Sequence, residues 1–241
     1  PKFNQVTYFT EKPNLVLLVD NSSSIIHLKQ DEKALSIIKK LSSNSDLNSK
    51  FNISKYAFGE QLKPLDSIQF EMSVAFGAKC ANVATMRTFG FPEGTIPNGF
   101  GIPFYFYDEF MKFNDFYSEV ETMIADPDFI SDLATRIDML KDFRKDIKDA
   151  PMPQWMLDEL QAMHDAFPVG TAVRCRSSTN NEDLPGFSGA GLYTSKTQHL
   201  DEGHISKSIK QVYASMWNFR AYDERDFYRV DQYIAAMGIL C

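Results

Sequence analysis

The segment VRCRSSTNNEDLPGFSGAGLY, from Val173 to Tyr193, holds side chains that could do chemistry and few that could fill a core. Its alternating start is typical of a strand, and Arg176 near the end of that strand is followed by hydroxyl side chains. Three glycines come next, at spacings of three and two residues, and glycines let the backbone approach a ligand and present its N–H groups to an anion. This combination suits a polyphosphate.

The spacing of these glycines differs from that of the common phosphate loops. It does not match GxxxxGK, and the segment lacks the strand-then-helix context of a dinucleotide-binding fingerprint. The residues therefore leave two interpretations open, namely a phosphate-binding loop of another kind or a glycine-rich surface turn that binds nothing.

A second polar cluster, Asp20, Ser22 and Ser24, lies in LLVDNSSSI directly after a predicted buried strand. Its hard oxygen atoms suit Mg²⁺ or Mn²⁺, and polar residues in this position are also typical of the turn that starts a helix. The Asp-x-Ser-x-Ser pattern resembles the start of a von Willebrand factor type A domain and its metal-dependent adhesion site. That family completes the metal shell with Thr and Asp from later loops, for which residues 1–71 offer no counterpart.

Periodicity predicts the elements that position these residues. Residues 14–20 form a continuous apolar run typical of a buried strand, residues 31–41 place apolar side chains on one helical face, and residues 51–59 alternate as a second strand. This order indicates a partial Rossmann-like βαβ segment. In the remainder, the patterns predict helices near 75–90, 105–113, 128–148, 153–166, 204–219 and after 223. They predict a short strand within 96–104 and strands near 171–178, near 192–200 and at the end.

Composition limits the classes of protein to consider. The 241 residues allow one large or two modest domains, and the net charge of −7 argues against a broad nucleic-acid or anionic-membrane surface. The longest apolar run, Leu15–Val19, is too short to span a bilayer. No signal peptide is apparent and the three cysteines are dispersed, so we expect a cytoplasmic protein. Charge changes from +1 over residues 1–71 to −8 over residues 72–241, which predicts two segments.

Three blocks resemble, in the same order, the N-terminal ATP-binding region of the pyruvate phosphate dikinase and phosphoenolpyruvate synthase family. They are AFGAKCANVATMRTFGFPEGTIPNGFGIP, VRCRSSTNNEDLPGFSGAGLY and SMWNFRAYDERDFYRVD, and the resemblance spans residues 73–241. Related glucan-water dikinases contain the same region. The resemblance implies that residues 72–241 are the first subdomain of an ATP-grasp nucleotide-binding unit, with ATP and Mg²⁺ as cofactors.

The resemblance also assigns roles to two cations. Lys79 in GAKCANV matches a lysine that reaches ATP phosphates, and an ammonium group is a mobile point charge with three donors. Arg176 matches an arginine that binds phosphate oxygens and stabilises charge on the transferring phosphoryl group, so it is the catalytic candidate. Taken without the resemblance, Lys79 reads as a solvated helix residue and Arg176 as a surface residue at a strand end.

Further matches concern the glycine-rich loop and a third arginine. The residues that match the loop expected to close over the phosphates, together with the recurrent arginine, are Ser188, Gly189, Ala190, Gly191 and Arg220. For Arg220, whose neighbours are mostly charged, a salt-bridged helix face is the alternative. The sequence departs from the family at Leu192, where many relatives have glutamine, and in having the single glycine Gly77 in the lysine block.

We therefore expect an α/β protein with a von Willebrand type A-like segment at 1–71 and an ATP-grasp subdomain at 72–241. The resemblance implies a parent enzyme that binds MgATP between two subdomains, phosphorylates a histidine on a swivelling domain, and passes the phosphoryl group to pyruvate or a related acceptor. The second subdomain and the phosphohistidine domain have no match here, so we expect the chain to be inactive alone. The alternatives are a metal-dependent protein-binding module with a degenerate nucleotide scaffold, and a purely structural fragment.

Overall fold

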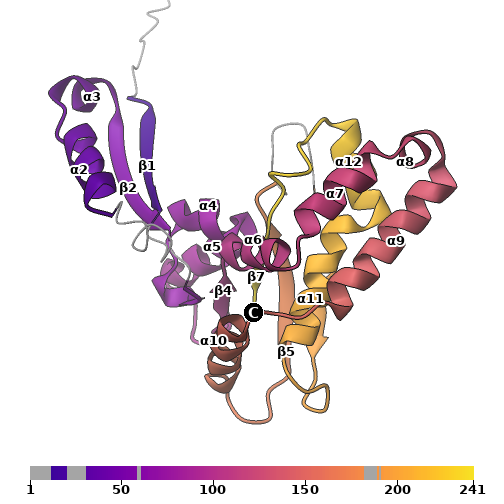
Figure 1. The fold of residues 1–241 in the computed structure, drawn as a ribbon. Coiled ribbons are helices and arrows are strands. Elements are labelled where there is room, and N and C mark those ends of the chain that lie inside the picture. The colour runs from indigo at the N-terminus through magenta and orange to yellow at the C-terminus, as the bar shows by residue number, and fades with distance from the viewer. Residues whose placement is uncertain (1–11, 21–30, 59–60, 182–188, 190) are drawn as a thin grey trace, which may run out of the picture. The chain divides into compact units, whose positions relative to one another are not determined.

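A computed structural model describes residues 12–20, 31–58, 61–181, 189 and 191–241. The chain divides into two compact units, Pro1–Glu60 and Gln61–Cys241. The described residues form a two-stranded sheet in the first unit and a five-stranded sheet in the second, and Figure 1 labels the elements of both. Each unit is described by itself below.

In the first unit, helices connect two parallel strands. Its elements are β1 (Asn14–Asp20), α2 (Asp31–Ser42), α3 (Ser45–Lys50) and β2 (Asn52–Phe58). β1 and β2 pair in parallel along their full length, which requires a crossover connection between them. The side chain of Asn44 caps α3 by accepting two backbone N–H groups of its first turn. The strand–helix–strand order matches the prediction, and α3 is an addition to it.

The boundary between the units lies earlier than the change in composition. The division falls between Glu60 and Gln61, whereas charge predicted a boundary near residues 71–72. Two observations place the intervening residues in the second unit: β3 (Lys63–Pro64) pairs with β4 of that unit, and Leu65 and Ile68 are buried there. The distribution of charged residues mainly reflects exposed side chains, so it gave no indication that β3 pairs with β4 or that Leu65 and Ile68 are buried.

The second unit is built on an antiparallel sheet with the strand order β3-β4-β7-β5-β6. Its remaining strands are β4 (Phe100–Ile102), β5 (Val173–Thr179), β6 (Lys196–Gln198) and β7 (Met237–Leu240). β7 lies between β4 and β5, and all its residues are buried. The predicted mixture of helices and strands is confirmed, but this sheet is antiparallel and therefore differs from the parallel pairing in the first unit.

Helices and short 3-10 turns make up most of the rest of the second unit. They are η1 (Leu65–Ser67), η2 (Phe70–Met72), α4 (Ser73–Phe76), α5 (Ala78–Met86), η3 (Arg87–Phe89), α6 (Phe104–Phe113), α7 (Phe116–Ala125), α8 (Pro127–Ser131), α9 (Leu133–Asp149), α10 (Gln154–Asp165), α11 (Ser206–Ala214), η4 (Ser215–Trp217) and α12 (Phe219–Phe227). Gly90, with φ of 70°, is the C-cap after η3, which agrees with the helix predicted near 75–90. The predicted helix at 128–148 is divided, because Asp132 accepts the backbone N–H of Thr135 and caps α9.

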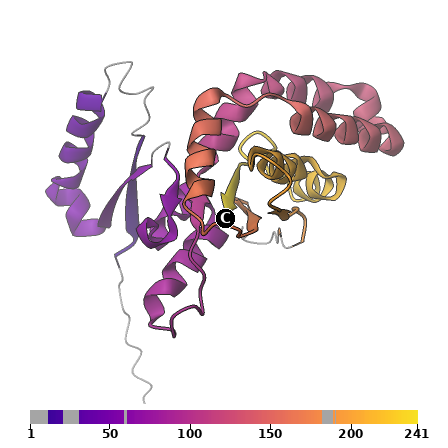
Figure 2. The same ribbon diagram turned by 90° about the horizontal axis from the view of Figure 1, so that it is seen from below.

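α5 and α11 cover opposite faces of this sheet. Ile239 of β7 joins the large core cluster that contains Ile209 of α11, whereas Leu240 joins a smaller cluster with Phe76 and Cys80. Because successive side chains of a strand point to opposite faces, the two clusters lie on the two sides of the sheet. Figure 2 shows the sheet among these helices in a second view.

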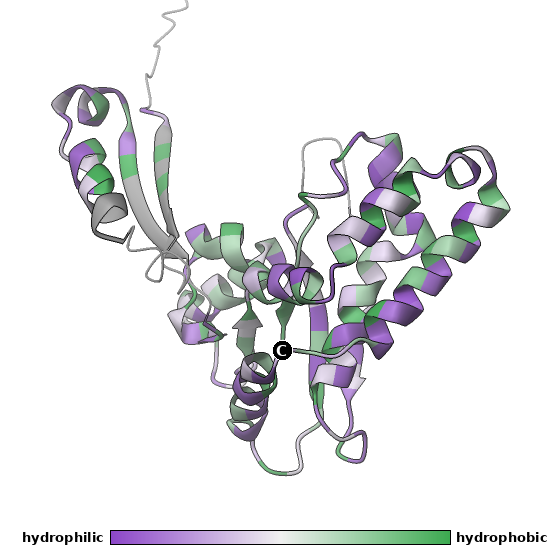
Figure 3. Ribbon diagram, viewed as in Figure 1, coloured by the Kyte–Doolittle hydropathy of each residue, from purple (hydrophilic) through white to green (hydrophobic). Residues whose placement is uncertain are grey.

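The large cluster contains aromatic side chains that meet edge to face. The rings of Phe143 and Trp217 are 5.1 Å apart, those of Tyr107 and Tyr213 are 5.2 Å apart, and Trp217 Nε1 donates to the Tyr107 hydroxyl at 3.1 Å. Figure 3 shows hydrophobic and hydrophilic residues alternating along the surrounding helices. The helix predicted near 204–219 is present as α11 and η4, and its apolar side chains are fully buried: Ile205, Ile209, Val212 and Met216.

Cys80 allows this packing to be tested by pH. Burial raises the pKa of its thiol from 9.0 to about 12, so the folded protein keeps a proton that the unfolded chain releases. The contribution of this thiol to the free energy of unfolding is complete below the pKa of the unfolded chain, 9.0, and is lost as the pH rises toward the pKa of the folded protein, about 12. Between about pH 8 and pH 10.5, we expect wild type to lose about 2 kcal/mol more unfolding free energy than Cys80→Ala. Urea unfolding measures this difference. Both proteins contain the buried tyrosines, so equal losses would contradict the assignment.

Candidate functional site

The N-terminal end of α5 lies directly against β5. The backbone N–H of Cys80 donates to Ser178 Oγ at 3.0 Å, although 98 residues separate the two in sequence. Gly77, just before α5, has φ of 82°, and a Cβ there would lie 2.4 Å from both the carbonyl oxygen and Oγ of Ser178. Only glycine fits this close approach without a shift of the strand. The lysine block and the arginine block are therefore in contact.

Lys79 extends this contact to the backbone of β5. Its Nζ donates to the carbonyl oxygen of Ser177 at 2.7 Å, and Ser177 directly follows Arg176. The ammonium group is half-buried and lies beside the strand that carries the arginine. The two cations that the sequence singled out are thus brought to one part of the sheet.

Arg176 lies on the face of the sheet that α5 covers. Side chains alternate along a strand, so Arg176 shares its face with Ser178, the residue that accepts the N–H of Cys80. Arg176 is exposed, and its guanidinium makes no hydrogen bond or ion pair with the described part of the chain. Arg174, two residues earlier on the same face, is also exposed, but it donates to Thr197 Oγ1 at 2.9 Å. Of the two arginines on β5, Arg176 is thus the one without a partner among the described residues.

The glycine-rich loop is described only at its C-terminal end. Ser188 and Ala190 lie outside the described residues, as do the acidic pair Glu182 and Asp183. Gly191 has φ of 77° and no atom within 4 Å of the position a Cβ would take, so the backbone there faces open space. Leu192, the departure from the family pattern, is buried against Ala221 of α12. The leucine therefore serves packing.

Arg220 and Arg225 of α12 have opposite environments. Arg220 has 73% of its side chain exposed, and its Nε lies 3.9 Å from Glu224 Oε1, one helical turn away. This position agrees with the salt-bridged helix face, and the nucleotide contact assigned to Arg220 remains a prediction. Arg225 is fully buried, although the charged residues around Arg220 suggested an exposed helix face. The burial of Arg225 could have been inferred from the sequence, because Arg225 shares one helical face with Ala221 and Tyr222.

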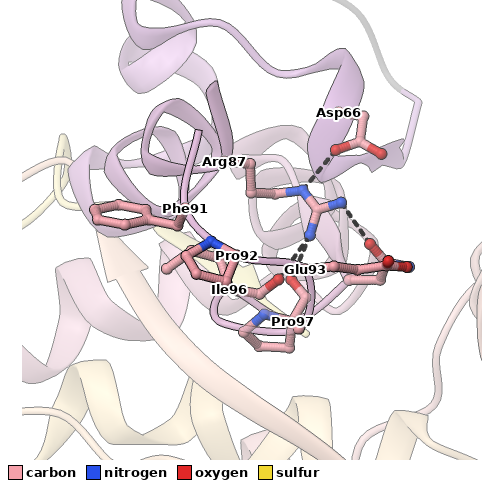
Figure 4. Close-up of a pocket in the computed structure, with 9 residues that line it drawn as sticks. Asp66, Arg87, Phe91, Pro92, Glu93, Ile96 and Pro97 are labelled. Carbon is pink, nitrogen blue, oxygen red and sulfur yellow. Dashed lines mark hydrogen bonds and ion pairs between the residues drawn. The ribbon is translucent and has the colours of Figure 1, made fainter. Parts of the chain in front are cut away.

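A pocket beside η3 contains another arginine, shown in Figure 4. Arg87 donates through Nε to Asp66 Oδ1 at 2.5 Å, through one terminal nitrogen to the carbonyl oxygens of Ile96 and Pro97, and through the other to Asn98. The guanidinium therefore makes four hydrogen bonds within the protein and holds the loop that follows Gly90. We assign it a structural role.

The predicted metal site is mostly outside the described residues. Asp20 is the last residue of β1, whereas Ser22 and Ser24 are not described. Within the described ranges, no three His, Cys, Asp or Glu side chains gather as a metal site would require. The adhesion-type metal site thus remains a prediction from sequence.

Comparison with known protein families gives one match. The family described as "Pyruvate phosphate dikinase, AMP/ATP-binding domain" matches residues 73–241. The match covers most of the chain, which therefore belongs to this family, as the three sequence blocks predicted. Among the helices that the structure describes, none has the length and apolar character needed to cross a membrane.

Curated relatives carry a consistent name. The chain is 27% identical over 175 residues to the probable phosphoenolpyruvate synthase of Staphylothermus marinus, covering 70% of this chain and 20% of the relative. The phosphoenolpyruvate synthase of Neisseria meningitidis serogroup B is 28% identical over 155 residues, which is 62% of this chain and 19% of the relative. That of Aeropyrum pernix is 26% identical over 185 residues, which is 73% of this chain and 22% of the relative. The chain thus spans about a fifth of these relatives.

Proposed function

We propose that this chain is the ATP-binding part of a phosphotransferase of the phosphoenolpyruvate synthase and pyruvate phosphate dikinase type. The observation that carries the proposal is the placement of Lys79 against the backbone of β5 next to the exposed Arg176. Phosphate groups need cations and N–H donors arranged in advance, and two cations on one rigid strand–helix contact meet that need. The family match supports the choice of ATP as the ligand.

The described residues fit the phosphates of ATP better than they fit its metal ion. Arg176 would bind phosphate oxygens through its planar guanidinium, and Lys79 would supply a second positive charge. Backbone N–H groups of residues 188–191 would add neutral donors. Mg²⁺ would neutralise phosphate charge, but it prefers carboxylate oxygen ligands, and the described residues hold no acidic cluster. In this proposal the metal ligands come from a second ATP-grasp subdomain.

In the complete enzyme, the proposed reaction is phosphorylation of a histidine on a separate domain, followed by transfer to pyruvate or a related acceptor. The role of this chain in that reaction is to hold the triphosphate and to stabilise the negative charge on the transferring group through Arg176. The chain spans about a fifth of its relatives, and we propose that ATP binding is the part of the reaction that it performs.

Titration with MgATP, followed by calorimetry, tests this proposal. We expect Lys79→Met and Arg176→Ala each to weaken ATP binding at least about tenfold, because each removes a charged contact to phosphate. Two matched controls are available. Lys210→Met removes a lysine that donates to a backbone carbonyl, that of Ala150, at the same 2.7 Å. Arg174→Ala removes the neighbouring exposed arginine of β5. Equal effects of the site variants and their controls would contradict the proposed site.

A further inference from the structure

Two cysteines meet across the pairing of β5 with β7. The Sγ atoms of Cys175, in β5, and Cys241, directly after β7, lie 3.9 Å apart, although 66 residues separate them in sequence. The strand register agrees with this contact. Arg176 pairs with Leu240, so the next two residues to meet in this antiparallel pair are Cys175 and Cys241. Both thiols are free.

The backbone of Cys241 faces away from β5. Its N–H donates to the carbonyl oxygen of Phe100 in β4 at 2.9 Å, and its carbonyl oxygen accepts the N–H of Phe100 at 2.9 Å. Since both backbone groups of Cys241 are directed at β4, Cys241 and Cys175 form a non-hydrogen-bonded pair. The Cα atoms of such a pair are about 4.5 Å apart, and the side chains approach closely. This separation lies within the range of about 4.4–6.8 Å that a disulfide requires.

The third cysteine lies on the other face of the sheet. Cys175 belongs to the large core cluster, and Cys241 packs against that cluster. Cys80 is buried in the smaller cluster on the opposite side. Cys175 and Cys241 can therefore react with each other while the sheet stays intact, whereas Cys80 would have to pass through it. Cys80 is thus an internal control for any reaction between the other two thiols.

We propose that Cys175 and Cys241 form a disulfide that joins β5 to β7, with hydrogen peroxide as the oxidant. The sulfur of Cys241, the less buried of the two residues, attacks peroxide and becomes a sulfenic acid, while one water molecule leaves. The sulfur of Cys175 then attacks that sulfur, and the hydroxyl group leaves with the Cys175 proton as a second water molecule. Two thiols and one peroxide thus give one disulfide and two water molecules.

The protonation of Cys241 sets how readily the pair reacts. The hydrogen bond with Cys175 and burial raise the pKa of Cys241 well above its usual value. Because the thiolate is the nucleophile, the disulfide forms faster as the pH rises. The link needs an oxidant, so it is a redox-responsive tie between two strands and not a permanent part of the fold. This inference goes beyond the proposed function and does not depend on it.

Peptide mapping of the folded protein after treatment with hydrogen peroxide tests this proposal. The treated protein is unfolded, its remaining thiols are alkylated, and it is digested without reductant. We expect a cross-linked pair of peptides that contains Cys175 and Cys241 and that dithiothreitol separates, while Cys80 is recovered in alkylated form. Cys80→Ala should form the same link, and Cys175→Ala should not. Cross-links to Cys80 in the proportions found after oxidation in urea would overturn the proposal, as would oxidation of Cys241 without any link.

Stability gives a second measurement. The disulfide closes a loop of residues 175–241 and so restricts the unfolded chain. We expect the equilibrium constant for unfolding of wild type, measured in urea, to fall about a hundredfold on oxidation. Cys175→Ala treated in the same way corrects for oxidation of methionines, and it should show no such fall. Equal responses of the two proteins would show that no link ties the native strands, and would overturn the proposal.

Discussion

Gly77→Ala is expected to lower the free energy of unfolding by about 3–4 kcal/mol, because it combines a disfavoured backbone conformation with a steric clash. The residue has φ of 82°, which side chains rarely adopt, and the added Cβ would meet the backbone of Ser178 at 2.4 Å. That backbone cannot move freely, since Ser178 pairs with Gly238 of the central strand β7. Urea or thermal unfolding followed by circular dichroism measures the loss.

Gly94→Ala is the matched control for this prediction. Gly94 has the same φ of 82°, but no atom lies within 4 Å of its hypothetical Cβ. The control therefore shows the backbone effect alone, which we expect to be about 1–2 kcal/mol. The difference between the two variants measures the contact of α5 with β5. Equal destabilisation by Gly77→Ala and Gly94→Ala would mean that α5 and β5 can move apart at little cost. It would contradict a rigid placement of Lys79 against β5.

Arg225→Ala is the second large prediction, with an expected loss of about 3–5 kcal/mol of unfolding free energy. Removal of the guanidinium leaves Gln232 Oε1 and the carbonyl oxygen of Met216 without their donor. It also opens a cavity next to Trp217, whose ring centre lies 5.9 Å from the guanidinium carbon. The same equilibrium unfolding measurement applies.

Arg220→Ala is the control on the same helix. Arg220 is mostly exposed, and its ion pair with Glu224 is long, so we expect a change within about 0.5 kcal/mol. A loss of similar size in both variants would contradict the separation of α12 into a buried and an exposed face. A loss in Arg225→Ala as small as that of Arg220→Ala would show that the hydrogen bonds of Arg225 contribute little to stability.

Local patterns predicted much of the fold, because they depend on neighbours in sequence. The strand at 173–179 follows from alternation, and the buried face of α11 follows from helical periodicity. The segment of α5 and η3 ends at Gly90, because glycine favours the left-handed conformation found there. The division of the helix at Asp132 was missed, because a capping side chain can interrupt a periodic pattern without changing it. The pairing of β3 with β4 was not predicted, because it joins residues that are distant in sequence.

The site was predictable in kind but not in geometry. The glycines, Arg176 and the hydroxyls indicated phosphate chemistry, and family resemblance selected Lys79. No spacing rule could place Lys79 Nζ on the carbonyl of Ser177, because 98 residues separate them. Arg225 was misplaced for a different reason, since a charged residue on a buried helical face is uncommon and the neighbouring charges suggested an exposed surface.

The position of β7 has a consequence for how the second unit folds. This strand is formed by residues 237–240, yet it separates β4 from β5 and bonds to both. The sheet therefore cannot form strand by strand as the polypeptide is synthesised. β4 and β5 are joined only when β7, which follows both in sequence, inserts between them. Contacts between residues so distant in sequence make folding slow. Until β7 inserts, the unpaired edges of β4 and β5 can pair with strands of other molecules.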